Sequence, residues 1–211
     1  MHLWQSGIIV NLLFTSKLRS FFGSQKSITS GASILMSGTV TSQLIVILSS
    51  PILTRLYTPE DFGLLAVYVS FFSLFFIIAS LRYELAIPIS RSVSATLAII
   101  KLNILLVLII VAMMVIVLAV SSDSLAKWPA LHELMAYWWI FPAGVLVAGM
   151  YKVFKFWMLK KKAFTVMAIS RVFQGASMTV AQIMLGLFGL GFFGLIAGHI
   201  VGFSFGLAVL L

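Results

Sequence analysis

The chain has 211 residues, of which 62% are hydrophobic and only 9% are charged. Soluble globular proteins carry about 25% charged residues, so this composition excludes an ordinary soluble domain and indicates an integral membrane protein. The formal net charge of +9 does not indicate a nucleic-acid partner, because membrane chains concentrate Lys and Arg in their cytoplasmic loops. The absence of cysteine excludes disulfides and thiol chemistry.

A weakly apolar segment precedes the strongly apolar part of the chain. Residues 1–30 contain an apolar run too short to span a bilayer, followed by basic residues, and we assign them to a cytoplasmic N-terminal segment. Residues 31–211 divide into apolar runs that are each long enough to cross a membrane. We predict an all-α integral membrane helical bundle of about six transmembrane helices, at about 31–54, 62–81, 93–120, 134–158, 164–185 and 188–211.

The connection after the first predicted helix is polar and short. Pro59 disfavours helical geometry at Thr58, so the first helix should end near Tyr57. Thr58 is then expected to cap the second helix, with Pro59 as its first residue. Glu60 and Asp61 follow in the first turn, where the helix dipole favours negative charge.

This connection and a second polar cluster at the end of the next helix carry a family resemblance. The two stretches read L-T-R-L-Y-T-P-E-D-F-G and L-R-Y-E-L-A-I-P. They resemble the first hairpin of the polysaccharide and O-antigen flippases, in the multidrug, oligosaccharidyl-lipid and polysaccharide exporter superfamily. The motif residues are Arg55, Tyr57, Pro59, Glu60, Asp61, Phe62, Gly63, Arg82, Tyr83 and Glu84. We interpret Arg82 and Glu84 as a local interfacial ion pair.

The resemblance implies a transporter that moves polyisoprenoid-diphosphate-linked oligosaccharide from the cytoplasmic to the periplasmic leaflet of the bacterial inner membrane. Such transport serves the biosynthesis of O-antigen (lipopolysaccharide), exopolysaccharide or capsule. The resemblance also implies one lobe of a twelve-helix, two-bundle protein. Because the chain stops in an apolar run at Leu211, we expect a truncated N-terminal half or one partner of an assembly. The implied partners are membrane lipids, the lipid-linked oligosaccharide, and a second half-transporter or other polysaccharide assembly proteins.

Two other functions compete with this one. One is a drug or cation exporter of the same superfamily, and the other is a non-transporting membrane fragment or scaffold. We expect no enzyme, no cofactor and no metal site, because the sequence has no recognisable catalytic or ligand motif. Four of the five acids, Glu60, Asp61, Asp123 and Glu133, fall at predicted extracytoplasmic connections. This placement argues against cation-coupled drug export, which needs a carboxylate deep in the bundle.

Lys and Arg are unevenly distributed over the predicted connections. Ten belong to the N-terminal segment and to the second and fourth connections, and two belong to the first and third. Lys152 and Lys155 are counted with the fourth connection. An excess of positive charge marks the cytoplasmic side, so we predict a cytoplasmic N-terminus.

Charges at membrane depth are the first candidates for function. Arg171, Gln174 and Gln182 share one face of the fifth predicted helix, and this polar stripe is expected to face the bundle interior and bind substrate. In the alternative interpretation Arg171 reaches to the interface and the glutamines bond neighbouring helices. Arg55, Arg82 and Lys101 are further candidates for substrate binding.

Small residues mark two helices for close packing. Ser30, Ser33, Ser37 and Thr41 recur at helical spacing in the first predicted helix. Gly194, Gly198, Gly202 and Gly206 recur at intervals of four in the last one, which lets another backbone approach closely. We expect His199, beside the second of these glycines, to be a hydrogen-bonding packing residue.

Overall fold

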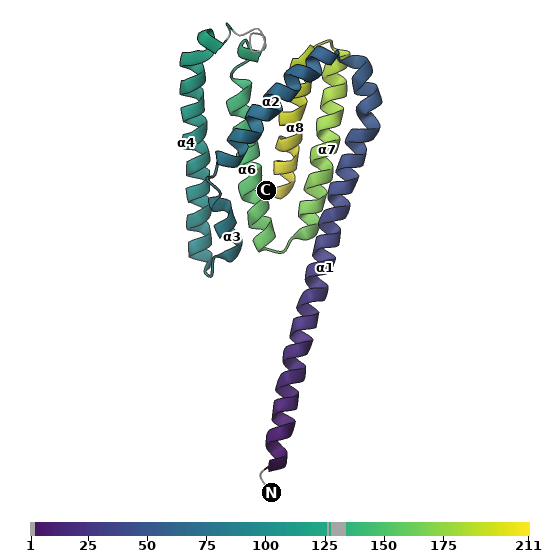
Figure 1. Ribbon diagram of the computed structural model, residues 1–211, viewed down its shortest axis with the longest axis vertical. Coiled ribbons are helices and arrows are strands. Elements are labelled where there is room, and N and C mark those ends of the chain that lie inside the picture. The colour runs from purple at the N-terminus through teal and green to yellow at the C-terminus, as the bar shows by residue number, and fades with distance from the viewer. Residues whose placement is uncertain (1–2, 126, 128–133) are drawn as a thin grey trace.

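The structure, a computed structural model, describes residues 3–125, 127 and 134–211, with side chains for 30–121, 127 and 134–211. These ranges form helices and turns with no strand (Figure 1). The long helices are α1 Leu3–Leu56, α2 Pro59–Ile78, α4 Val93–Leu125, α6 Ile140–Lys160, α7 Phe164–Leu187 and α8 Gly191–Leu210. Among the described residues, five helices are long and apolar enough to cross a membrane: α1 from Ser30, α2, α4 to Ser121, α6 and α8. The predicted helical membrane bundle is confirmed.

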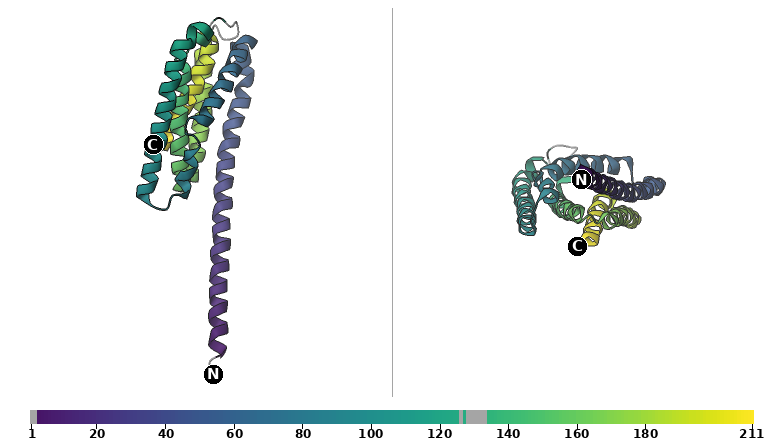
Figure 2. Two further views of the ribbon diagram at one scale, coloured as in Figure 1. Left: turned by 60° about the vertical axis from the view of Figure 1, so that its left-hand side comes forward. Right: turned by 90° about the horizontal axis from the view of Figure 1, so that it is seen from below.

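The helices are not packed in their order along the chain. α1 packs on α7, α7 on α8, α8 on α6, and α6 on α4. α2 crosses this row and packs on α8 and α6 (Figures 1 and 2). α7 therefore lies between α1 and α8.

α1 is longer than predicted. It begins at Leu3 instead of near residue 31, and its N-terminal part projects beyond the other helices (Figure 1). The helix therefore runs without a break past residue 30. The division there into an N-terminal segment and a bundle stays a prediction.

The second predicted helix, 62–81, corresponds to α2, but the connection that follows it contains further helical turns. α2 ends at Ile78, and the chain resumes as the 3-10 turn η1 Tyr83–Leu85 and the short helix α3 Ala86–Ile89. Between them, Leu81 and Arg82 have positive φ angles of 46° and 61°, which residues other than glycine seldom adopt. Pro88 gives a physical reason for the break. Its ring would clash with the carbonyl four residues earlier in a continuous helix, but it is tolerated in the first turn of a new one.

α1 uses a different face from the predicted hydroxyl stripe to pack on α7. Ser33, Ser37 and Thr41 are exposed, so they do not form the predicted close contact among the described residues. Gly31 and Gly38 are buried instead, and a Cβ atom on Gly38 would lie 2.7 Å from the backbone of Ala168. Each buried glycine follows a serine of the predicted stripe by one residue, which turns it by about 100° around the helix.

The glycine stripe of α8 lies against α7. Gly194, Gly198, Gly202 and Gly206 are all buried. A Cβ atom on Gly198 would lie 3.0 Å from the backbone nitrogen of Gln182, and one on Gly202 would lie 2.9 Å from the carbonyl oxygen of Gln174. The two backbones therefore approach so closely that a larger side chain would have to separate them.

Candidate functional site: cations inside the bundle

The hairpin between α1 and α2 forms as its sequence predicts. Thr58 is the N-cap of α2, Pro59 begins the helix, and α1 ends at Leu56. Asp61 accepts hydrogen bonds from the backbone N–H and the hydroxyl of Thr58, at 2.8 and 2.9 Å, and donates its own N–H to the Thr58 hydroxyl oxygen. This reciprocal capping box fixes the direction in which α2 leaves the corner.

Tyr57 anchors the hairpin to the rest of the bundle. Its buried hydroxyl donates a hydrogen bond to the backbone carbonyl of Gln182 at 2.6 Å. The ring fits a gap left by Gly186 and Gly194, where Cβ atoms would lie 2.9 and 2.6 Å from Tyr57 atoms. Burial, followed by the charge of Asp61, raises the pKa of the phenol, so Tyr57 remains a donor. The motif therefore fastens the α1–α2 corner onto α7 and α8.

Gln182 is part of this packing arrangement and does not join Arg171. Its side-chain amide donates to the carbonyl of Leu195 on α8 at 3.0 Å, and only 5% of the residue is exposed. It thus bonds a neighbouring helix, as the alternative interpretation of the stripe supposed. Its contacts stabilise the α7–α8 hairpin.

Arg171 and Gln174, in contrast, lie together on α7. The guanidinium donates to the Gln174 side-chain oxygen at 3.3 Å and lies 5.8 Å from the centre of the Tyr151 ring on α6. Lys155 is one turn after Tyr151 on the same face of α6, so it lies on the side of α6 that faces Arg171. Two like charges from different helices thus share one half-buried place.

No acid compensates this pair in the described part of the chain. There, the salt bridge joins a different lysine, Lys152, to Glu84. Glu60 and Asp61 lie in the first turn of α2, at the other end of the bundle (Figure 1). Lys155 and Arg171 therefore form a cationic site that lacks its own counter-charge, which we call the α6–α7 cation pair.

The position of Arg171 along α7 helps to decide whether its guanidinium lies inside the bundle or reaches to the membrane interface. Arg171 lies seven residues into α7, about 10 Å along its axis. Both of its neighbours lie deeper, because Gln174 is one turn further along α7 and Tyr151 is nine residues from the end of α6. A guanidinium that reached for the interface would point the other way. The geometry favours a cation held inside the bundle.

The other candidate cations are elsewhere. Arg55 is exposed in the last turn of α1, Arg82 is exposed in the break after α2, and Lys101 is exposed on α4. The structure brings none of them into contact with Arg171.

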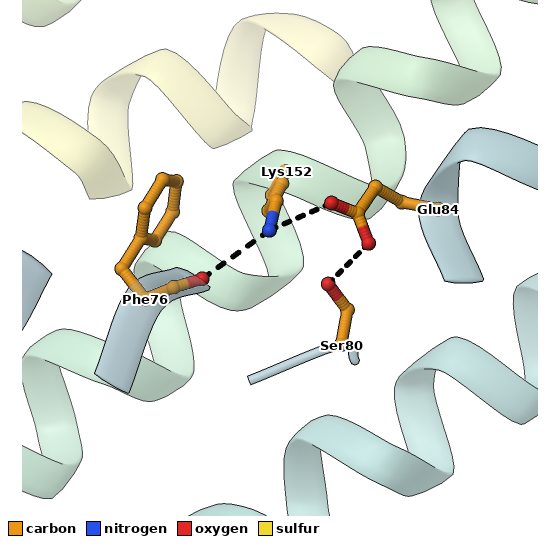
Figure 3. Close-up of polar contacts among 4 residues, drawn as sticks. All are labelled: Phe76, Ser80, Glu84 and Lys152. Carbon is orange, nitrogen blue, oxygen red and sulfur yellow. Dashed lines mark hydrogen bonds and ion pairs between the residues drawn. The ribbon is translucent and has the colours of Figure 1, made fainter. Parts of the chain in front are cut away.

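A buried ion pair occupies the break between α2 and α3 (Figure 3). Lys152 on α6 donates to Glu84 at 2.7 Å and to the carbonyl of Phe76 at 3.3 Å. Ser80 donates to the second carboxylate oxygen at 2.5 Å. Glu84 is 2% exposed, so its predicted pairing with Arg82 is wrong. The left-handed turn at Arg82 directs Glu84 inward, and Lys152 meets it there.

The positions of Lys152 and Glu84 also correct two arguments from the sequence: the count of basic residues in the connections and the placement of the acids. Lys152 and Lys155 lie within α6 and not in a connection. The count becomes eight basic residues on the predicted cytoplasmic side (Lys17, Arg19, Lys26, Arg82, Arg91, Lys160, Lys161, Lys162) against two on the other (Arg55, Lys127). The bundle also contains a buried carboxylate, Glu84, so the placement of the other acids no longer argues against coupling to a cation.

His199 lies among aromatic rings and not in a polar network. The rings of Phe72, Phe203 and Tyr68 lie 4.9, 5.1 and 5.8 Å from the imidazole. Neither the His199 Nδ1 nor the Tyr68 hydroxyl has a hydrogen-bond partner among the described residues. The expected hydrogen-bonding role is therefore not observed at Nδ1, and the ring packs as an aromatic side chain.

The comparison with known families agrees with the hairpin resemblance. A family model described as polysaccharide biosynthesis protein matches residues 52–211, which is most of the chain. The chain belongs to the polysaccharide biosynthesis protein family. No curated protein and no solved structure matches it.

Within this member of the polysaccharide biosynthesis protein family, sequence reasoning missed Lys152 and Lys155. They were missed because the residues around them are rich in lysine and aromatic side chains, a composition that also fits a loop at the membrane surface. A usable signal was present nonetheless. Tyr151 and Lys155 are four residues apart, as on one helix face, and the apolar pattern continues beyond both.

Proposed function

We propose that this polysaccharide biosynthesis protein is a flippase for polyisoprenoid-diphosphate-linked oligosaccharides in the bacterial inner membrane. It would move them from the cytoplasmic to the periplasmic leaflet for the assembly of O-antigen, exopolysaccharide or capsule. The observation that carries the proposal is the α6–α7 cation pair, which lies inside an apolar bundle without a counter-charge among the described residues.

A diphosphate would supply the negative charge that the α6–α7 cation pair lacks. Arg171 offers a planar, permanently charged fork of donors that matches phosphate oxygens, and Lys155 adds a compact second charge. Gln174 holds the guanidinium by one hydrogen bond, which leaves its other donors for a ligand. An anion bound there would remove the repulsion between the two cations, so the site favours the charged headgroup over a neutral sugar alone.

The position of the pair agrees with loading from the cytoplasmic side. Lys155 is five residues from the end of α6 and Arg171 seven from the start of α7, beside the connection that carries Lys161 and Lys162. The eight-to-two distribution of basic residues favours that end as cytoplasmic. The lipid tail would stay in the bilayer while the diphosphate and sugar cross along the polar residues of the bundle.

The same charges weigh against the alternatives. A transporter of cationic drugs would present two positive charges to its substrate, which like-charge repulsion disfavours. In a scaffold, an uncompensated cation pair would only cost stability. We propose accordingly that the protein is a transporter and not an enzyme, with the lipid-linked oligosaccharide as its partner.

Deletion of the gene in its host tests this function. We expect surface polysaccharide to be lost while the lipid-linked oligosaccharide accumulates and stays inaccessible to a glycosidase added to the periplasmic side. Resistance to cationic drugs should not change. Normal surface polysaccharide, or trapped saccharide that the glycosidase digests fully, would contradict the proposal. Increased drug sensitivity with normal polysaccharide would favour the drug exporter.

A further inference from the structure

The break between α2 and α3 gathers several features that each favour a positive charge at one point. The Lys152 ammonium lies there, 2.7 Å from a carboxylate oxygen of Glu84. The carbonyl of Phe76, in the last turn of α2, lies 3.3 Å away, and last-turn carbonyls form the negative end of the helix dipole. The Phe76 ring centre is 5.0 Å from the same nitrogen, a distance at which the ring face attracts a cation.

These groups lie well inside the bundle. Lys152 is eight residues from the end of α6, about 12 Å along its axis. Glu84 is 2% exposed, and Ser80, which orients its carboxylate by a hydrogen bond, is fully buried. A carboxylate buried in this way cannot stay bare, because an unpaired buried charge costs several kcal/mol. Wherever Glu84 stays buried, a cation or a proton must therefore neutralise it.

The ammonium is attached to a different helix from the oxygens that surround it. Glu84, Ser80 and Phe76 belong to α2 and the turn that follows it, which together with α3 we call the broken span. Lys152 reaches them from α6 (Figure 3). The turn that presents Glu84 includes two residues at positive φ, Leu81 and Arg82, and such backbone persists only where its surroundings hold it. A separation of the broken span from α6 would remove the ammonium and leave the oxygens together.

We propose that the carboxylate of Glu84 and the carbonyl of Phe76 form a binding site for a monovalent metal cation such as Na⁺, which the protein's own Lys152 ammonium occupies in this structure. Na⁺ enters when Lys152 leaves. Carboxylate, carbonyl and water oxygens are ligands for hard cations, and helix ends at a discontinuous span coordinate such ions.

The site has a consequence for transport, which rests on the proposed function. Lys152 and Lys155 are one helical turn apart on α6. A diphosphate bound to the α6–α7 cation pair would attract the Lys152 ammonium away from Glu84. Uptake of Na⁺ at Glu84 would then be linked to binding of the anion. The cation site itself is tested without any substrate, so its failure leaves the proposed function standing, and the reverse also holds.

The test compares purified wild-type protein with Lys152→Met and with the double variant Lys152→Met/Glu84→Gln. Thermal unfolding is measured in NaCl and in N-methylglucamine chloride of equal ionic strength, because the organic cation is much larger than Na⁺. We expect the wild-type midpoint to be equal in both salts. The Lys152→Met midpoint should rise by several degrees with Na⁺ and then saturate, as for a ligand that binds the folded state. The double variant should not respond.

Three results would overturn the proposal. One is an equal Lys152→Met midpoint in the two salts, including the case in which only a lower pH stabilises it and Glu84 takes up a proton. Another is the same Na⁺ response in the double variant, which would place the ion elsewhere. Lys152→Gln serves as a second variant if Lys152→Met is not recovered. Failure of both to fold even in NaCl would be the third, because Na⁺ should replace the missing charge.

Discussion

The hydroxyl of Tyr57 donates a hydrogen bond to the backbone carbonyl of Gln182 at 2.6 Å, across the junction between the α1–α2 corner and α7. Tyr57 is one of the motif residues that resemble the flippase hairpin. Its side chain packs against Gly186 and Gly194 inside the bundle. This part of the motif therefore orients helices, and the α6–α7 cation pair lies at the opposite end of α7.

Removal of the Tyr57 hydroxyl tests this anchoring role. We expect Tyr57→Phe to lower the free energy of unfolding by about 1 kcal/mol, because one buried hydrogen bond is lost, while the ring still fills its place. Tyr57→Ala should cost about 3–5 kcal/mol, because it also leaves a cavity. Thermal unfolding in detergent measures both. Tyr83→Phe is the matched control, since Tyr83 is an exposed motif tyrosine. An equal loss in Tyr83→Phe would argue against a specific anchor.

The approach of α8 to α7 predicts opposite effects for two glycines. A Cβ atom on Gly198 would meet the Gln182 side chain and backbone, whereas one on Gly63 meets nothing within 4 Å. Gly198→Ala should therefore destabilise the protein, and Gly198→Leu should lower its abundance in the membrane. Gly63→Ala should be neutral or stabilising by up to about 1 kcal/mol, because alanine favours helix. Folded yield and thermal unfolding measure this. Normal yield and stability of Gly198→Leu would show that the helices do not need this contact.

The ion pair of Glu84 and Lys152 predicts strong non-additivity. In sodium-free buffer, Glu84→Gln and Lys152→Met should each cost about 3–5 kcal/mol, because each leaves one buried charge unpaired. The double variant should lose much less than the sum, since no bare charge remains. Glu60→Gln, at an exposed acid of the same span, is the control and should change stability by less than about 0.5 kcal/mol. Additive losses would mean that the pair is not a unit.

The orientation of the bundle follows from the corrected count of basic residues. With eight on one side and two on the other, we predict that both ends of α1–α8 lie in the cytoplasm. A reporter active only in the periplasm should work when fused after Lys127 and fail after Lys161. A reporter active only in the cytoplasm should show the reverse. The opposite result at either position would contradict the orientation.

Local chemistry made part of this structure predictable. The Thr58–Asp61 capping box and the end of α1 follow from neighbouring residues, so sequence alone was sufficient. The glycines of α8 indicated close packing for the same reason. The 3-10 turn and short helix after α2 were missed because the polar cluster of Arg82 and Glu84 indicated a plain connection there. Lys152 and Glu84 were misplaced because their partners are far apart in the chain. Whether Arg171 points inward or outward also depended on Tyr151, a residue of another helix.

Glycan export by Arg171 variants tests the central claim most directly. If the α6–α7 cation pair binds the diphosphate, Arg171→Ala should reduce export by about ten- to a hundredfold, as expected for the loss of a charged hydrogen bond. Arg171→Lys should lose part of the activity, because lysine lacks the bidentate fork. Lys101→Ala, which removes an exposed cation on α4, should export normally, and membrane abundance is measured for each variant. Full export by an abundant Arg171→Ala protein would contradict the account.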